Sequence, residues 1–321
     1  MTWRIDERIL TAWRRVDEDL TALPGPLGSL WHQYATTLAH RAAVEDLSKA
    51  LQRPEAFPSL PLLWWTASLV GFEDEQALDE LSYGTLMGYL FIRIQDDVLD
   101  GHTKSENLLV ANAAQERFQE VFRRHFGTKH RFWDIWLSWL VDFSAATAWE
   151  IQEHRNRRQT FTTPDLDRLG EKFLPAAAPP AALAFTAGRD ELVRPIRELV
   201  TTLGSGLQLI NDHRGIRHDF ETNNYTAVIT DILVTVPKIR LAEELAFPNR
   251  ALTTDAMERN LRRARIYLER AADLGRAMGM SQVAAYVQEH QEAILVELER
   301  LKNMRSELIE NSPAIRAQGR S

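Results

Sequence analysis

The sequence lacks cysteine altogether. A disulfide framework, a thiolate metal site and a cysteine nucleophile are therefore excluded. Glycine and proline are sparse, at 15 and 13 residues, and fall mainly between segments whose apolar residues recur every three or four positions. Glycine and proline residues placed in this way are typical of the ends of helices. An apolar run of about 18 residues, which a transmembrane helix requires, is missing too, so we expect no integral membrane span.

Two further shortages narrow the class of protein. The N-terminal segment MTWRIDERIL carries charges where a signal peptide needs an apolar run, and we therefore expect a soluble, cytoplasmic protein. Basic residues are also outnumbered, because the chain has 38 Lys and Arg residues and 45 Asp and Glu residues, which gives a net charge of −7. A phosphate backbone would need a local basic patch that this balance does not suggest, so nucleic acid is not an expected partner.

The spacing of apolar residues predicts an all-α fold. Apolar positions recur at helical intervals nearly throughout, while alternation over the length of a strand is hard to find. Of the 321 residues, 45% are hydrophobic, which suffices for one large core. The proline-rich segments 23–28 and 175–180 are too short for linkers, and we interpret them as a turn and a helix break. We therefore predict a single domain over residues 1–321, whose polar tail after about residue 311 can be disordered.

Two predicted helices end in acidic or amide side chains that continue an apolar face. In the first helix the segment QDDVLD at 95–100 supplies the acids, and the face consists of Thr85, Tyr89, Ile92, Asp96 and Asp100. In the second helix the segment NDHRGIRHD at 211–219 supplies them, and the face consists of Val200, Leu203, Leu207, Asn211, Gly215 and Asp219. Both helices are thus expected to aim polar side chains inward.

Carboxylates one helical turn apart repel each other. Their β-carbons lie roughly 5–6 Å apart, and two charges about 4 Å apart cost on the order of 4 kcal/mol at an effective dielectric constant near 20. A hard cation relieves this repulsion, and Mg²⁺ suits oxygen-only ligands because it completes its shell with water and phosphate oxygens. A solvated acidic helix end also explains either cluster alone. The two clusters together predict a site that binds a diphosphate through metal ions.

The segment QDDVLD resembles the first aspartate-rich motif of the trans-prenyltransferase and class I terpene synthase superfamily. LGSGLQLINDHRG at 203–215 resembles the helix that carries the second aspartate-rich motif of trans-isoprenyl diphosphate synthases, with Gln208 and Asp212 in the usual places. Asn211 and Gly215 replace two aspartates of that motif. The pattern Asn211, Gly215, Asp219 is closer to the metal triad of terpene synthases, which is normally Asn, Ser or Thr, and Glu.

The resemblance implies a helical bundle of the isoprenoid synthase type with a central active-site cavity and three Mg²⁺ ions, or Mn²⁺ in their place. The catalytic residues that it implies are Asp96, Asp97, Asp100, Asn211 and Asp219. The metal-binding positions would be Asp96, Asp100, Asn211, Asp219 and, through a water molecule, Gly215. Contacts to the diphosphate would come from Lys172, Arg214, His218 and Tyr225. The substrate pocket would be lined by Tyr89, Phe91, Ile92, Phe143 and Gln208. For the basic residues, an ordinary surface charge is an equally good interpretation.

The resemblance also separates the branches of the superfamily. Chain-elongating members carry a Gly-Gly-Lys-Arg segment near the N-terminus and an Arg-Arg-Gly after the first motif, and here GHTKSENLLVANAA follows that motif instead. We therefore expect a class I terpene cyclase that acts on an allylic prenyl diphosphate, farnesyl or geranylgeranyl diphosphate, and releases a terpene hydrocarbon or alcohol. Two alternatives stay open. One is a prenyl diphosphate synthase or head-to-head condensing prenyltransferase, and the other is a non-catalytic regulatory subunit of a prenyl synthase. A homodimer is compatible with each of them.

Overall fold

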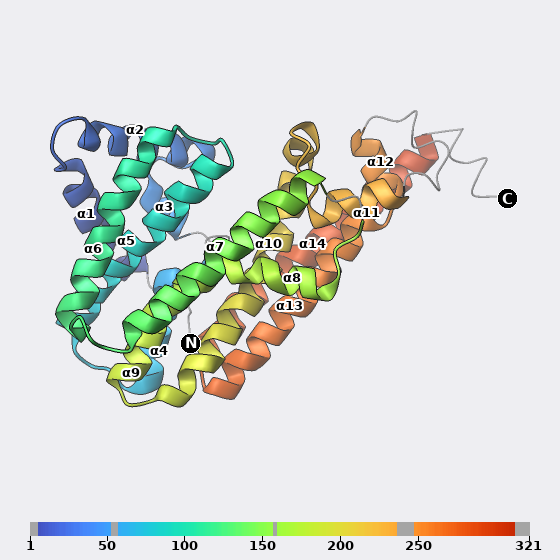
Figure 1. Ribbon diagram of the computed structural model, residues 1–321. Coiled ribbons are helices and arrows are strands. Elements are labelled where there is room, and N and C mark those ends of the chain that lie inside the picture. Colours follow the sequence, from blue (N-terminus) through green and yellow to red (C-terminus); the bar gives the residue numbers. More distant parts are fainter. Residues whose placement is uncertain (1–5, 53–56, 157–158, 236–246, 312–321) are drawn as a thin grey trace. The chain divides into compact units, whose positions relative to one another are not determined.

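The computed structural model describes residues 6–52, 57–156, 159–235 and 247–311 (Figure 1). Helices make up all the regular structure of these residues, and no strand occurs among them. The predicted all-α fold is confirmed. The proline-rich segment at 23–28 contains the turn between the first two helices and the start of the second, which begins at Pro26. Pro175 lies within a short 3₁₀ helix, so both segments interrupt α-helices as expected. The expected tail beyond residue 311 lies outside the described residues.

The chain divides into two compact units. Unit 1 comprises Met1–Val141, Phe173–Glu198 and Gly275–Ala285, and unit 2 comprises Asp142–Lys172, Leu199–Leu274 and Tyr286–Ser321. The long helices α7, α10, α13 and α14 contribute residues to both units. The expectation of a single domain therefore stays a prediction, and the two units are described separately.

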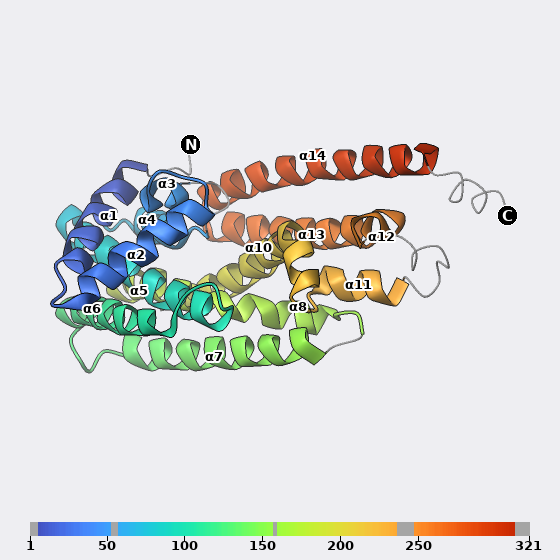
Figure 2. The same ribbon diagram turned by 90° about the horizontal axis from the view of Figure 1, so that it is seen from above.

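Unit 1 is built around α5, which packs most extensively against α6, and the two helices run side by side in both views (Figures 1 and 2). Glycine allows this close approach, because a β-carbon at Gly88 would lie 2.9 Å from a ring carbon of Phe118. The helical segments of this unit are α1 Asp6–Thr21, α2 Pro26–Arg41, α3 Leu47–Leu51, α4 Ser59–Val70, α5 Glu75–Leu99, η1 Ser105–Asn107, α6 Leu108–Phe126, α9 Ala178–Thr186, η3 Asp190–Leu192 and the first part of α7 Phe132–Asn156.

Helix α5 places the first acidic segment at its C-terminal end. Asp74 caps the N-terminus by accepting a 3.0 Å hydrogen bond from the backbone N–H of Ala77. At the other end the helix stops at Leu99, and Gly101 adopts a φ of 71°, a left-handed conformation that glycine takes without strain. QDDVLD therefore occupies the last turn of α5, where the chain leaves the helix.

Unit 2 holds most of the C-terminal half of the chain. Its helices α8 and α10 approach closely, because a β-carbon at Gly170 would lie only 2.1 Å from the carbonyl oxygen of Thr201, and Ser205 donates a 2.9 Å hydrogen bond to the carbonyl of Leu166. Its helical segments are the later part of α7, α8 Thr163–Gly170, most of α10 Val193–Glu221, α11 Ala227–Thr235, α12 Phe247–Thr253, α13 Ala256–Met278 and α14 Ser281–Asn311, while η2 Glu171–Ala177 begins in this unit.

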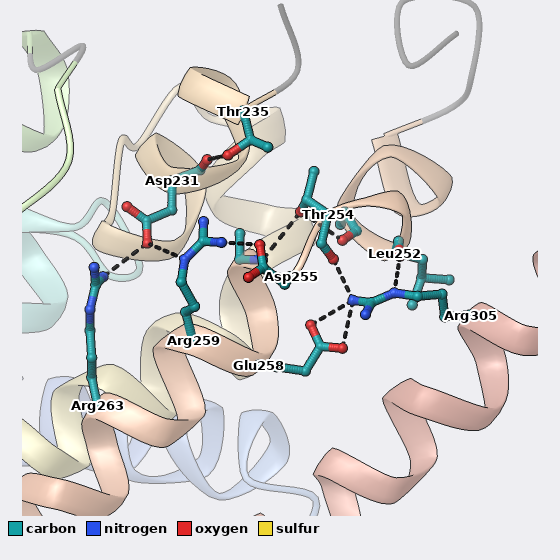
Figure 3. A network of polar contacts seen from close by, with 11 residues as sticks. Asp231, Thr235, Leu252, Thr254, Asp255, Glu258, Arg259, Arg263 and Arg305 are labelled. Atoms are coloured by element: carbon teal, nitrogen blue, oxygen red, sulfur yellow. Dashed lines mark hydrogen bonds and ion pairs between the residues drawn. The ribbon is translucent and has the colours of Figure 1, made fainter. Parts of the chain in front are cut away.

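Arginine side chains tie the C-terminal helices of unit 2 together (Figure 3). Arg263 of α13 donates a 2.9 Å hydrogen bond to Asp231, which is buried on α11. Arg305 of α14 donates to the carbonyl of Leu252 at the end of α12, at 2.8 Å, and to Glu258 of α13, at 2.7 Å. Because carbonyl groups at helix ends have no partner within their own helix, such donors fix one helix end against another. These contacts hold α11 and α12 in place on α13.

Candidate functional site

The last turn of α5 places its three aspartates in different environments. Asp97 is fully buried, Asp96 is half-buried, and Asp100 is exposed. This differs from the expectation that Asp96 and Asp100 would form the innermost face. Neighbouring helix positions are separated by about 100°, so Asp96 and Asp97 cannot both face the core. Here it is Asp97 that faces the core, because its hydrogen-bond partners lie there.

Three side chains hold the carboxylate of Asp97. Its Oδ2 accepts a 2.8 Å hydrogen bond from the hydroxyl of Tyr34, and its Oδ1 accepts hydrogen bonds from Arg41 at 3.0 Å and from Arg93 at 2.9 Å. Burial by itself would raise the pKa of Asp97, but Arg93, Tyr34 and Arg41 outweigh burial and hold that pKa below its usual value. Asp97 is therefore ionised and fixed.

Asp97 also holds the backbone beyond the helix. Its carbonyl oxygen accepts hydrogen bonds from the backbone N–H of His102 at 2.7 Å and of Thr103 at 3.2 Å. The basic side chains near it reach the other two acids as well, since Arg93 lies 3.9 Å from Asp96 and His102 lies 3.9 Å from Asp100. Asp97 thus positions the helix end, and Asp96 and Asp100 are the carboxylates that reach its more open side.

On α10 one face carries Gln208, Asp212, Gly215 and Asp219 at helical spacing. Asp212 is only 2% exposed. Its Oδ1 accepts a 2.8 Å hydrogen bond from Gln208, and its Oδ2 has no hydrogen-bond partner within the described part of the chain. Burial, reinforced by the charge of Asp219, raises the pKa of Asp212 to about 8. Asn211, the metal ligand expected from the sequence, is exposed beside this face.

Asp219 lies at the last turn of α10 and is held by its surroundings. Its Oδ1 accepts a 3.0 Å hydrogen bond from the side-chain amide of Asn224. Its Oδ2 lies 3.0 Å from the point where a β-carbon at Gly215 would be. Burial raises the pKa of Asp219, and the hydrogen bond from Asn224 and the nearby His218 oppose that rise. The missing side chain at Gly215 therefore leaves room for this carboxylate.

Helix α7 contributes a buried polar face that sequence reasoning missed. Thr147, Glu150 and His154 lie at helical spacing and are each about 5–6% exposed, although they stand in a helix rich in tryptophan. Glu150 forms an ion pair with Lys172, and its charge raises the pKa of both Asp212 and Asp219. Polar residues at core positions of an apolar helix were the available signal.

The other predicted residues fall into three groups. Lys172 is mostly buried and faces Glu150. The exposed residues among the expected diphosphate contacts are Arg214 and His218, while Tyr225 is half-buried and donates its backbone N–H to the carbonyl of His154 at 2.6 Å. Among the expected pocket residues, Phe91 and Phe143 are buried, and Tyr89, Ile92 and Gln208 are half-buried. Burial raises the pKa of Tyr89.

The donor set of unit 2 suits a hard cation that brings some of its own ligands. Three carboxylates, those of Glu150, Asp212 and Asp219, influence one another electrostatically. Lys172 is the basic group that acts on Glu150 and Asp212, and His218 is the one that acts on Asp219. No cluster of three or more His, Cys, Asp or Glu side chains among the described residues is already arranged to hold a metal ion. Mg²⁺ does not need such a cage, because it is commonly bound by one or two carboxylates together with water and phosphate oxygens.

Within the described ranges, no helix combines the length and the apolar character needed to cross a bilayer.

Comparison of the structure, in contrast to comparison of the sequence, finds similar proteins. No family model and no curated protein matches the sequence. Heptaprenyl diphosphate synthase from Staphylococcus aureus is 15% identical, with a TM-score of 0.66 over 90% of this chain and 98% of that chain. Polyprenyl synthase from Roseobacter denitrificans is 14% identical, with a TM-score of 0.64 over 90% of this chain and 95% of that chain.

A third similar structure is polyprenyl synthase from Caulobacter crescentus, complexed with calcium and isoprenyl diphosphate. It is 14% identical, with a TM-score of 0.62 over 89% of this chain and 98% of that chain. At these identities the likeness concerns the fold. The chain has the all-α fold of the isoprenyl diphosphate synthases, as the two motifs predicted.

Proposed function

We propose that the protein is a divalent-metal-dependent enzyme that ionises an allylic prenyl diphosphate and transfers the prenyl group to a second isoprenoid. The observation that carries this proposal is the buried Asp212 of α10, whose second oxygen lacks a hydrogen-bond partner within the described residues. A buried acid left in this state is costly unless a ligand compensates it. Three polyprenyl or heptaprenyl diphosphate synthases share this fold, which supports a prenyl diphosphate as that ligand.

Each residue has a proposed role that follows from its position. Asp96 and Asp100 on α5 would hold Mg²⁺, as would Asn211, Asp219 and the open oxygen of Asp212 on α10. These ions, three by resemblance, would stabilise the negative charge that develops on the departing diphosphate. Lys172, held by Glu150, would donate to a diphosphate oxygen. Asp97 would keep the end of α5 in place through Tyr34 and Arg41. Phe91 and Phe143 would exclude water from the carbocation.

Terpene cyclisation is the second candidate function, and the sequence provides the observation in its favour. The chain lacks the Gly-Gly-Lys-Arg and Arg-Arg-Gly segments with which elongating enzymes hold their second diphosphate. Asn211, Gly215 and Asp219 also follow the terpene synthase pattern more closely than the aspartate-rich one. In unit 1, however, Arg41, Arg93 and His102 gather at the end of α5. Both arginines already pair with Asp97, so the support for prenyl transfer is the likeness of the fold to three polyprenyl or heptaprenyl diphosphate synthases.

One experiment tests the proposal and separates the two candidates. The protein is incubated with Mg²⁺ and farnesyl or geranylgeranyl diphosphate, with and without isopentenyl diphosphate, and both released diphosphate and extracted products are measured. Prenyl transfer predicts a product that appears only with isopentenyl diphosphate. A hydrocarbon or alcohol formed from the allylic substrate alone would support the cyclase instead. Absence of turnover with allylic diphosphates of C10 to C25 would contradict both candidate functions. The non-catalytic regulatory subunit would then be the remaining alternative.

A further inference from the structure

The loop after α10 returns to Asp219 and donates two hydrogen bonds to it, one to the backbone carbonyl and one to the carboxylate. Helix α10 ends at Glu221, and the chain turns at Asn223, whose φ of 57° is left-handed. This turn brings back Asn224, whose backbone N–H donates to the carbonyl of Asp219 at 2.7 Å. The side-chain amide of Asn224 then donates to Oδ1 of the same aspartate at 3.0 Å. One residue thus contacts both the backbone and the side chain of Asp219.

On its other side the carboxylate lies in the space that a side chain at position 215 would take. A β-carbon at Gly215 would lie 3.0 Å from Oδ2 of Asp219, which is closer than real β-carbons normally come to an oxygen. Asp219 therefore folds back over the preceding turn of α10 into space that any other residue at 215 would occupy. The hydrogen bond from Asn224 and the space at Gly215 together favour the orientation that the carboxylate has in the structure.

The next residue attaches the loop to a second helix. Tyr225 donates its backbone N–H to the carbonyl of His154 at 2.6 Å, and this carbonyl lies near the end of α7. One turn earlier α7 carries Glu150, whose charge acts on Asp219. The location of Asn224 is therefore set by α7 as well as by α10. The loop connects these two helices, which carry Glu150 and Asp219.

We infer that Asn224 is a positioning residue, which holds the Asp219 carboxylate in the orientation that binds the metal ion of the proposed site. The inference rests on the proposed function, because Asp219 is a metal ligand only there. Hydrogen bonds that orient a ligand contribute to metal affinity, and their loss typically weakens binding by roughly 10- to 100-fold. A carboxylate that loses its hydrogen-bond donor samples other rotamers. Metal binding must then restrict those rotamers, which weakens the affinity for the metal.

The test compares three variants by Mn²⁺ binding, followed by electron paramagnetic resonance in the presence of inorganic diphosphate. Asn224→Ala removes the donor, and we expect it to raise the Kd of Mn²⁺ roughly tenfold. Gly215→Ala pushes the same carboxylate from the opposite side and should also weaken binding, while its helix gains stability because alanine favours helices over glycine. Asn223→Gly is the matched control. It relieves the positive φ beside Asn224 and should leave the Kd unchanged.

A purely structural role for Asn224 predicts a different result. Asn224→Ala would then lower the midpoint of thermal unfolding and leave the Kd of Mn²⁺ within twofold of the wild-type value, and this outcome overturns the inference. If Asn224→Ala does not fold, Gly215→Ala decides, because weaker Mn²⁺ binding together with a raised midpoint supports the inference and unchanged binding contradicts it. Wild-type protein that binds Mn²⁺ but turns over no allylic diphosphate would refute the proposed reaction alone.

Discussion

The hydroxyl of Tyr34 on α2 donates a 2.8 Å hydrogen bond to Asp97 on α5, 63 positions further along the chain. Asp96, one residue earlier, is half-buried and takes no part in this bond. The two adjacent aspartates of the first motif therefore have different roles. Asp97 is a structural anchor within unit 1, and Asp96 remains a candidate ligand.

Replacement of Asp97 should destabilise the protein, whereas replacement of Asp96 should not. Asp97→Ala leaves Arg41 and Arg93 beside a buried site without their shared carboxylate, and breaking a buried ion pair costs about 3–5 kcal/mol. Both arginine side chains are about one third exposed, at 35% and 31%, so we expect a smaller loss, of about 2 kcal/mol. Asp96→Ala should leave the free energy of unfolding unchanged or slightly raised. Urea unfolding measures both variants, and equal losses would contradict these assignments.

Asp212 should make the stability of the protein depend on pH. Its pKa is raised to about 8 in the folded protein from an ordinary value of about 4, so it stabilises the fold only while protonated. That contribution is complete below about pH 4 and is lost as the pH rises to about 8.

Asp212→Asn should therefore unfold at a higher temperature than the wild type, by a margin that grows between these two pH values and is constant above them. Asp219 and Asp231, whose pKa values are also raised, remain in both proteins. The difference between the two melting curves thus reports Asp212 together with its interaction with Asp219. A margin that is independent of pH would refute the raised pKa.

The ion pair between Lys172 and Glu150 should show strong coupling in a double-mutant cycle. Lys172→Met leaves Glu150 close to Asp212 and Asp219 with less positive charge nearby, and the loss of one partner of a buried pair costs about 3 kcal/mol. Glu150→Gln in the same protein should recover much of that loss, because one of the repelling charges is removed. Additive effects in the cycle, measured by chemical unfolding at pH 8, would mean that the two side chains do not depend on each other.

Metal removal and loss of the ligands should stop turnover in the same way. EDTA should abolish the reaction, and added Mg²⁺ should restore it. Asp96→Ala and Asn211→Ala should each abolish turnover while the far-UV helix signal is kept. Diphosphate release measures all of these changes. Activity that survives thorough chelation would contradict the metal-dependent mechanism, and loss of the helix signal would make these residues structural.

The sequence predicted the fold and the helical placement of the two acidic segments better than the surroundings of individual side chains. Helical spacing placed QDDVLD at the end of a helix, and Gly101 ends that helix as expected of a breaker. Spacing could not tell Asp96 from Asp97, because the choice depends on Tyr34 and Arg41, which are distant in the sequence.

Two other features escaped prediction for similar reasons. Glu150 is one of four acids in a tryptophan-rich helix, and it resembles a surface charge until Lys172 is placed against it. Asn224 belongs to a loop whose path depends on the left-handed turn at Asn223 and on the carbonyl of His154. Local patterns of hydrophobicity carry no information about such contacts.

The central proposal, that metal-dependent turnover of a prenyl diphosphate requires the acidic segment of α5 and that of α10, is tested most directly by diphosphate release under single-turnover conditions. The wild type should release diphosphate from farnesyl or geranylgeranyl diphosphate when Mg²⁺ and isopentenyl diphosphate are present. Asp96→Ala and Asn211→Ala, one variant on each helix, should each reduce that release to background. Release at the wild-type rate by either variant, in a protein that is otherwise active, would contradict the account.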